Sequence, residues 1–147
     1  MSSQLLAKLN RDWQEFLDSI EGLPDSALSD AGVVGTWSVR DIMGHVTTWE
    51  EEALNRLPIV LAHETGPGYS SLGGIDAFNA QKVTEKRGQA LDQVRRDLTA
   101  THQVLLSRVI DIPDNAVDAE FERRFGEDTW DHYREHAEQI RAWRSKQ

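Results

Sequence analysis

Apolar residues recur at intervals of three and four along four stretches of the chain, and this spacing predicts four amphipathic helices. The first covers residues 3–21, where Leu, Trp, Phe and Ile alternate with charged residues and Gly22 and Pro24 end the pattern. Residues 25–36 are rich in Ser, Asp and Gly and predict a loop. Strand-like alternation nowhere exceeds these helical patterns, so the sequence predicts an all-α protein.

The second helix has a clear start signal at Ser38. Ser38 and Asp41 are spaced as a capping box, and Trp37 and Ile42 flank it as a hydrophobic staple. The buried face that follows comprises Val39, Ile42, Met43, Val46, Trp49 and Ala53. His45 falls at the edge of this face, beside Trp49.

A long connection follows at residues 56–75, which contain Pro58, Pro67 and four glycines, with a short helical turn expected at 59–62. Loops longer than about 12–15 residues are uncommon in compact domains and often carry function. This segment is therefore expected to act as a crossover, a lid, or both.

The third helix is predicted from about residue 76 to residue 110, and Gly88 is expected to kink or divide it. Its apolar stripe comprises Leu91, Val94, Leu98, Leu105 and Val109. Residues 111–128 are polar and contain Pro113 and Gly126, which predicts a linker.

The fourth helix, residues 129–143, carries two histidines four residues apart. His132 and His136 stack at the edge of its apolar stripe, with Cβ atoms roughly 5–6 Å apart, so both imidazoles can converge on one divalent ion. The stripe itself consists of Trp130, Tyr133, Ala137 and Ile140. Four such helices in 147 residues predict one domain, an antiparallel four-helix bundle spanning residues 1–147.

His45 and His136 both lie near the middle of their helices and are therefore expected to be level in the bundle. With His132 they form a set of three neutral imidazoles with open positions, as catalytic zinc sites do. Imidazole also suits nickel, copper and iron, and zinc or nickel is the metal expected here. Such an ion lowers the pKa of a water or thiol and supplies a nucleophile at neutral pH.

Other side chains near these histidines have several interpretations. Asp41, Glu52 and Glu135 are spaced to accept the second N–H of a histidine. Trp49 belongs to the core or lines a pocket mouth. Two further pocket candidates are Asn79, at the start of helix three, and Tyr133, beside His132.

The alternative interpretation is that His132 and His136 are two partly exposed side chains that bind no metal. His63, in the long connection, and His102, on the flank of helix three, have no partner at ligand spacing. Both are interpreted as structural or surface residues.

Composition narrows the chemistry further. The chain has no cysteine, so any nucleophilic thiol has to come from a substrate. Its net charge of −9, with acidic and basic residues intermixed, argues against nucleic-acid binding. No apolar run approaches about 20 residues, which argues against a membrane span. The N-terminal residues lack signal-peptide regions, so a cytoplasmic protein is expected.

Three segments resemble the DinB/YfiT-like four-helix-bundle superfamily. They are Gly35-Thr-Trp-Ser-Val-Arg-Asp-Ile-Met-Gly-His-Val-Thr-Thr-Trp-Glu50, Asp76-Ala-Phe-Asn79, and His132-Tyr-Arg-Glu-His136-Ala-Glu-Gln-Ile140. The most similar branch is the ClbS/DfsB-type group. The resemblance implies an up-down-down-up bundle, with residues 56–75 as the crossover between helices two and three. It also implies a divalent metal held by His45, His132 and His136.

The resemblance implies more than one activity. Some superfamily members are transferases or isomerases that use a low-molecular-weight thiol, and the ClbS branch resembles enzymes that open a reactive electrophile by hydrolysis. The first expectation is therefore a metal-dependent enzyme that acts on a small electrophilic molecule by hydrolysis or thiol transfer. The alternatives are a non-enzymatic bundle that binds or sequesters a small molecule, and a structural dimer. A homodimer is expected in either case.

Overall fold

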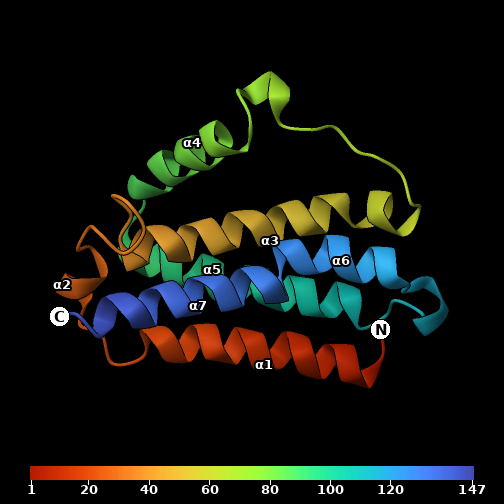
Figure 1. Ribbon diagram of the computed structural model, residues 1–147, viewed down its shortest axis with the longest axis horizontal. Coiled ribbons are helices and arrows are strands. Elements are labelled where there is room, and N and C mark those ends of the chain that lie inside the picture. The colour runs from red at the N-terminus through yellow and green to blue at the C-terminus, as the bar shows by residue number, and fades with distance from the viewer.

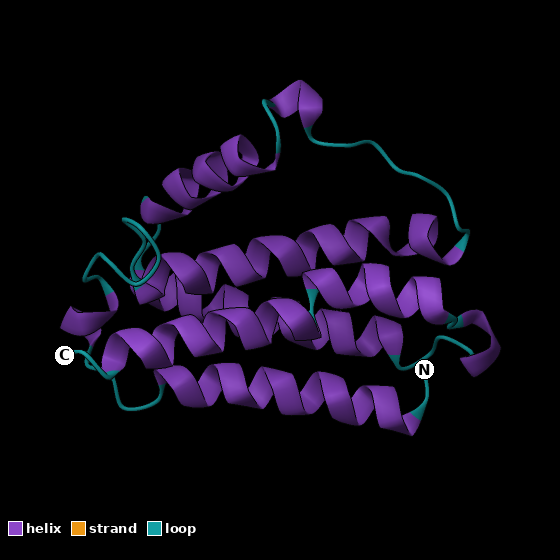
Figure 2. Cartoon of the chain, viewed as in Figure 1, coloured by secondary structure: helices purple, strands orange, loops and turns teal.

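The computed structural model describes all 147 residues, and its regular structure is helical, apart from one isolated β-bridge between Val34 and Trp37 (Figure 2). This confirms the all-α class. The α-helices are α1 (Ser3–Ile20), α2 (Asp25–Leu28), α3 (Val39–Leu61), α4 (Ile75–Arg87), α5 (Leu91–Val109), α6 (Ala119–Asp128) and α7 (Trp130–Arg144). Two 3-10 turns, η1 (Ser70–Leu72) and η2 (Asp114–Ala116), complete the set. None of these helices combines the length and the apolar character needed to cross a bilayer.

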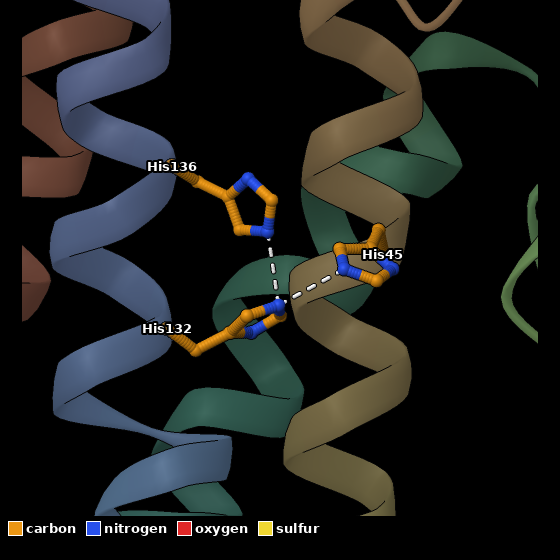
Figure 3. Close-up of side chains that lie close together, drawn as sticks. All are labelled: His45, His132 and His136. Carbon is orange, nitrogen blue, oxygen red and sulfur yellow. Dashed lines mark hydrogen bonds between the residues drawn. The ribbon is translucent and has the colours of Figure 1, made fainter. Parts of the chain in front are cut away.

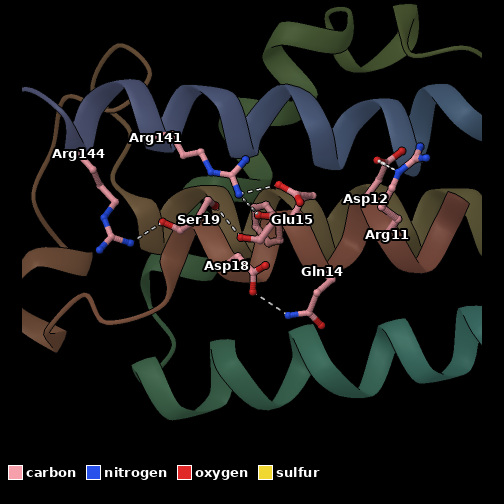
Figure 4. A network of polar contacts seen from close by, with 9 residues as sticks. Arg11, Asp12, Gln14, Glu15, Asp18, Ser19, Arg141 and Arg144 are labelled. Carbon is pink, nitrogen blue, oxygen red and sulfur yellow. Dashed lines mark hydrogen bonds and ion pairs between the residues drawn. The ribbon is translucent and has the colours of Figure 1, made fainter. Parts of the chain in front are cut away.

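Helices α1 and α7 run in the same direction. Arg144 near the end of α7 donates to the carbonyl of Ser19 near the end of α1 at 2.8 Å. One turn earlier on both helices, Arg141 pairs with Glu15 at 2.7 Å (Figure 4). These contacts align the C-terminal ends of the first and last helices.

Helices α3 and α5 run together in the opposite direction (Figure 1). Arg40 at the start of α3 donates to the carbonyl of Gln89, just before α5, so these two helices begin side by side. The amino group of Met1 donates to the carbonyl of Ile112 beyond the end of α5, so α1 begins where α5 ends. Helices α1 and α7 thus run antiparallel to α3 and α5.

The four long helices enclose one core. Each of them contributes fully buried side chains, among them Leu9, Phe16, Ile42, Val46, Leu105, Tyr133 and Ile140. Burying each large apolar side chain stabilises the fold by roughly 1.5–3 kcal/mol relative to leaving it exposed. At the start of α3, Ser38 and Asp41 form the predicted capping box, which fixes where this helix begins.

The predicted third helix is divided at Gly88, as expected, and its two parts have different roles. Residues 91–109 form α5 inside the bundle, whereas residues 75–87 form α4, which lies outside it against α3 (Figure 1). The buried residues of α4, Phe78 and Val83, are not part of the main core.

The long connection is shorter than predicted because α3 continues through Pro58 to Leu61. The turn expected at 59–62 is thus the last turn of α3. The crossover proper runs from residue 62 to residue 74 and contains η1.

The prediction of a linker at 111–128 is wrong for its second half, where α6 forms. The side chain of Asp118 caps this helix by accepting the N–H of Phe121 at 2.9 Å. Phe121 and Phe125, one turn apart, are buried and stack with their ring centroids 5.2 Å apart. An N-cap aspartate followed by two aromatic residues at helical spacing was the signal that the polar composition obscured.

Candidate metal centre

The three predicted histidines meet between α3 and α7 (Figure 3). The Nε2 atom of His132 lies 2.9 Å from Nε2 of His45 and 2.9 Å from Nε2 of His136. All three rings therefore present the same nitrogen to one point. Tetrahedral zinc with Zn–N bonds of about 2.0–2.1 Å requires nitrogens separated by roughly 3.3 Å, so small ring rotations suffice to hold an ion.

Local packing explains why these rings face one another. On α3, Ile42 and Val46 are fully buried in the core, which turns the intervening His45 to the edge that faces α7. On α7, Tyr133 and Ala137 are buried, and each follows one of the ligand candidates in the sequence. The apolar stripes of the two helices thus set the rotation that brings the imidazoles together.

Burial keeps the imidazoles neutral. His45 and His136 are only 6% and 5% exposed. Burial, with a smaller contribution from His136, lowers the pKa of His45 to about 3. Burial also lowers the pKa of His132 and of His136. Neutral imidazole is the form that binds a metal, so no proton has to be removed at neutral pH.

The outer nitrogens of the rings have different partners. Nδ1 of His136 lies 2.7 Å from Oε1 of Gln139, one turn further along α7. This contact fixes the ring so that Nε2 points at the cluster. Sequence reasoning missed Gln139, although its position three residues after His136 places it on the same face. Nδ1 of His132 is buried and has no partner.

The donor set fits a divalent cation better than it fits a cluster of free imidazoles. Nε2 of a neutral imidazole carries either one N–H or one lone pair, so Nε2 of His132 can form a full hydrogen bond with only one of the two nitrogens that it contacts at 2.9 Å. A cation accepts all three lone pairs at once and leaves each Nδ1 as an N–H donor. His45, His132 and His136 are thus the residues that could hold a metal.

A cavity of about 430 Å³ opens onto the three histidines. Its apolar walls are Val34, Trp37, Trp49 and Ile75. Trp49 is held in place because its Nε1 donates to Oδ1 of Asn79 on α4 at 2.8 Å. The predicted pocket candidates Trp49 and Asn79 therefore both line this cavity. Its volume falls in the range of small-molecule sites.

The three carboxylates considered as histidine partners lie elsewhere or at the rim. Asp41 caps α3 and pairs with Arg87 at 2.9 Å. Burial raises the pKa of Asp41, but hydrogen bonds from Arg87 and Ser38 outweigh this effect, so the pKa lies below its usual value. Glu52 neighbours Tyr69; burial and this carboxylate raise the pKa of Tyr69 to about 12. Glu135 lines the cavity without a hydrogen bond to a histidine.

Tyr133 points away from the cavity into the core. Its hydroxyl donates to Oε2 of Glu50 at 2.5 Å, and Nδ1 of His102 lies 2.7 Å from the same oxygen. Trp13 stacks on His102 with ring centroids 3.7 Å apart. His102 is therefore a buried structural residue in a polar cluster that joins α1, α3, α5 and α7.

His63 lies apart from the metal candidates at the start of the crossover. Its Nε2 atom is 2.7 Å from Asp118, and the side chain is half exposed. Its φ of 57° places it in the left-handed region, where a non-glycine residue is uncommon. The structural or surface interpretation fits its position.

A helical bundle with a three-histidine cluster is typical of a class of small helical proteins that often bind metals. The comparison with family models supports this class. The model of the DinB superfamily matches residues 8–140, so the chain belongs to the DinB superfamily. This match concerns the superfamily and does not distinguish among its branches. No curated protein and no solved structure matches the chain.

Proposed function

We propose that this protein is a divalent-metal-dependent enzyme that acts on a small electrophilic molecule. One observation carries the proposal: two buried imidazoles and one half-buried imidazole direct their Nε2 atoms to one point, and all three line a cavity of small-molecule size. Three protein ligands with a further position open to the cavity is the arrangement of catalytic rather than structural sites.

The chain's own residues hold and orient the reacting groups. His45, His132 and His136 supply the ligands, and zinc or nickel suits them. When bound, such an ion acts as a Lewis acid and lowers the pKa of water or of a thiol. Trp37 and Trp49 line the approach with apolar surface, which excludes bulk water and accommodates the carbon skeleton of a substrate.

Two nucleophiles are compatible with this site, water and an external thiol. The chain has no cysteine, so a thiol reaction requires a low-molecular-weight thiol that enters through the same cavity. Hydrolysis requires only water. Superfamily membership supports either reaction and names no substrate.

The test begins with protein that carries no histidine tag. Elemental analysis after expression, and zinc titration after chelation, should show one divalent ion per chain. The His132→Ala/His136→Ala double variant should lose this ion, whereas His63→Ala, which removes a half-exposed histidine outside the cluster, should retain it. If the unaltered protein neither contains nor takes up a metal at micromolar concentration, the proposal fails.

A second candidate function is sequestration of a small molecule without chemistry. The tryptophan walls of the cavity favour it, because they provide binding surface independent of any metal. The same double variant separates the two functions. Loss of metal together with turnover supports the enzyme, whereas ligand binding that survives loss of the metal supports sequestration.

A further inference from the structure

Two carboxamide side chains line the cavity beside the three histidines, Asn79 on α4 and Gln139 on α7. Each uses its oxygen atom to hold a ring of the site. Oδ1 of Asn79 accepts the indole N–H of Trp49 at 2.8 Å, and Oε1 of Gln139 lies 2.7 Å from Nδ1 of His136. The two amides thus share one arrangement, although they belong to different helices.

The orientation of the Asn79 amide follows from the chemistry of its partner. The indole nitrogen of Trp49 only donates, so the amide atom that faces it has to be the oxygen. Trp49 is buried, and its ring packs edge-on against that of Phe78, the residue before Asn79, with ring centroids 5.8 Å apart. The oxygen of Asn79 is therefore occupied by Trp49, and the NH2 group is the free end of the amide.

The NH2 group of Gln139 is free for a similar reason. An imidazole that binds an ion through Nε2 carries its proton on Nδ1, so Oε1 of Gln139 is the atom that accepts from His136. Asp76 and Glu135, which lie one turn before Asn79 and Gln139 on the same helices, accept no hydrogen bond from either amide. The cavity therefore contains two NH2 groups without an acceptor, next to the metal candidates.

Unpaired amide N–H groups in a cavity are suited to an oxygen acceptor on the ligand. No lysine or arginine lines this cavity, whereas sites for carboxylate or phosphate groups usually supply such a cation. An uncharged carbonyl oxygen is therefore the acceptor that fits this lining best. The rings of Trp37 and Trp49 offer apolar surface to the rest of the same molecule.

We propose that the substrate is a small molecule with an uncharged carbonyl group, an ester or an amide, whose oxygen accepts hydrogen bonds from Asn79 and Gln139. This inference rests on the proposed function, because it names the electrophile of the same cavity. In hydrolysis of such a molecule, the oxygen of water bonds to the carbonyl carbon, the bond from this carbon to the alkoxy or amino group breaks, and that group leaves with a proton of the water. Negative charge develops on the carbonyl oxygen during this step, and N–H donors to that oxygen stabilise it.

Two probes of the same shape test for recognition of the carbonyl oxygen. In para-fluoroacetophenone a carbonyl oxygen occupies the place of the CH2 group of para-fluoro-α-methylstyrene, and neither probe is hydrolysed. Each is titrated into the full-length, metal-free protein, so that no ion binds the oxygen, and fluorine NMR measures the affinity. We expect the ketone to bind roughly three- to tenfold more tightly than the styrene, the range for a neutral hydrogen bond.

Matched variants remove the N–H donors and keep the acceptors. Asn79→Asp and Gln139→Glu each retain an oxygen for Trp49 or His136 and replace the NH2 group. The double variant should bind the two probes equally, with its affinity for the styrene unchanged. Gln103→Glu makes the same kind of change at an exposed position of α5 outside the cavity, and it should retain the preference for the ketone.

Several outcomes overturn the inference. They are equal affinities of the unaltered protein for the two probes, tighter binding of the styrene, and no binding of the ketone at millimolar concentration. A preference that survives in the double variant also overturns it, as does loss of both probes in that variant, since the amides then only support the fold. Zinc uptake is measured separately. A preference for the ketone without zinc uptake refutes the proposed function alone, and zinc uptake without the preference refutes this inference alone.

Discussion

Gln139 is the residue that orients one of the three imidazoles. Its Oε1 atom lies 2.7 Å from Nδ1 of His136, and this contact selects the tautomer with a free Nε2. The spacing of His132 and His136, with His45 at the edge of the second helix, indicated a possible cluster, and the resemblance to the DinB/YfiT-like superfamily favoured it over partly exposed histidines. Gln139 was not predicted because a glutamine on a helix has several possible partners, and the sequence does not fix the histidine's rotamer.

Replacement of Gln139 by alanine should weaken zinc binding by roughly tenfold or more, since loss of an outer-shell partner typically costs a factor of 10–100 in metal affinity. Competition with a chromogenic chelator measures the affinity. Glu138→Ala alters the neighbouring exposed residue and serves as the control. An unchanged affinity in Gln139→Ala means that the contact does not orient the ring.

Asp128 gives the stability of the protein a pH dependence. Burial raises its pKa from 3.8 to about 7 in the folded state. Between about pH 4 and 7 the unfolded chain releases this proton and the folded chain keeps it, so the stability conferred by Asp128 decreases as the pH rises. The Tm of Asp128→Asn relative to that of the unaltered protein should therefore increase as the pH rises from 4 to 8.

Thermal unfolding of both metal-free proteins across this range measures the difference in Tm. Asp111→Asn, at an exposed position, serves as the control. A difference in Tm between Asp128→Asn and the unaltered protein that stays constant with pH contradicts the assignment.

At the scale of the elements, the junction of α6 and α7 positions α7, which carries two of the three clustered histidines. Thr129 separates the two helices with φ −125° and ψ −102°, and its hydroxyl donates to the carbonyl of Phe125 at 2.8 Å. Gly126 lies directly against the ring of Trp130, and a Cβ at this position would overlap the indole nitrogen. The close approach of Gly126 to Trp130 thus fixes how α7 leaves α6.

Gly126→Ala should destabilise the protein by about 1–3 kcal/mol, the usual cost of overpacking a well-packed site, because Trp130 has to move. Urea unfolding measures the loss. Gly68→Ala adds the same methyl group where nothing lies within 4 Å, and we expect a change of less than about 0.5 kcal/mol. Equal effects of the two changes contradict this account of the junction.

The long, strongly periodic helices could be predicted from sequence, and the boundaries set by tertiary contacts could not. Residues 3–20 carry a clear apolar stripe that ends at Gly22 and Pro24, and residues 39–61 follow a capping box at Ser38. In α6, by contrast, only Phe121 and Phe125 are strongly apolar, and the helix packs against α3, which is distant in sequence. Gly88 indicated the division between α4 and α5, but the position of α4 outside the bundle, against α3, could not be predicted from a local pattern.

At the scale of the whole molecule, the polar cluster around Glu50 ties the long helices together. Glu50 is fully buried on α3, and it accepts from Tyr133 on α7 and contacts His102 on α5. A buried carboxylate is tolerated only with such partners. Because His132 precedes Tyr133, the same cluster that stabilises the core also sets the position of the metal candidates.

Tyr133→Phe should lower the free energy of unfolding by about 1–3 kcal/mol, since Glu50 loses a donor without gaining access to water. Urea unfolding of metal-free protein measures this. Tyr69→Phe removes a hydroxyl from the crossover, where the side chain is partly exposed, and should cost less. If Tyr133→Phe is as stable as the unaltered protein, the hydroxyl does not stabilise the buried carboxylate.

Helix α4 is attached to the bundle along one side only, and its buried residues lie outside the main core. Segments with so few buried contacts open at a lower free energy than the rest of a domain, and their backbone amides exchange with deuterium earlier. We expect residues 75–87 to exchange before residues 39–61, and the reverse order argues against a separate unit. Asp76 and Asn79 lie on this segment, whereas the imidazoles lie on the bundle. Local opening of α4 would therefore widen the entrance to the cavity without displacing the three histidines.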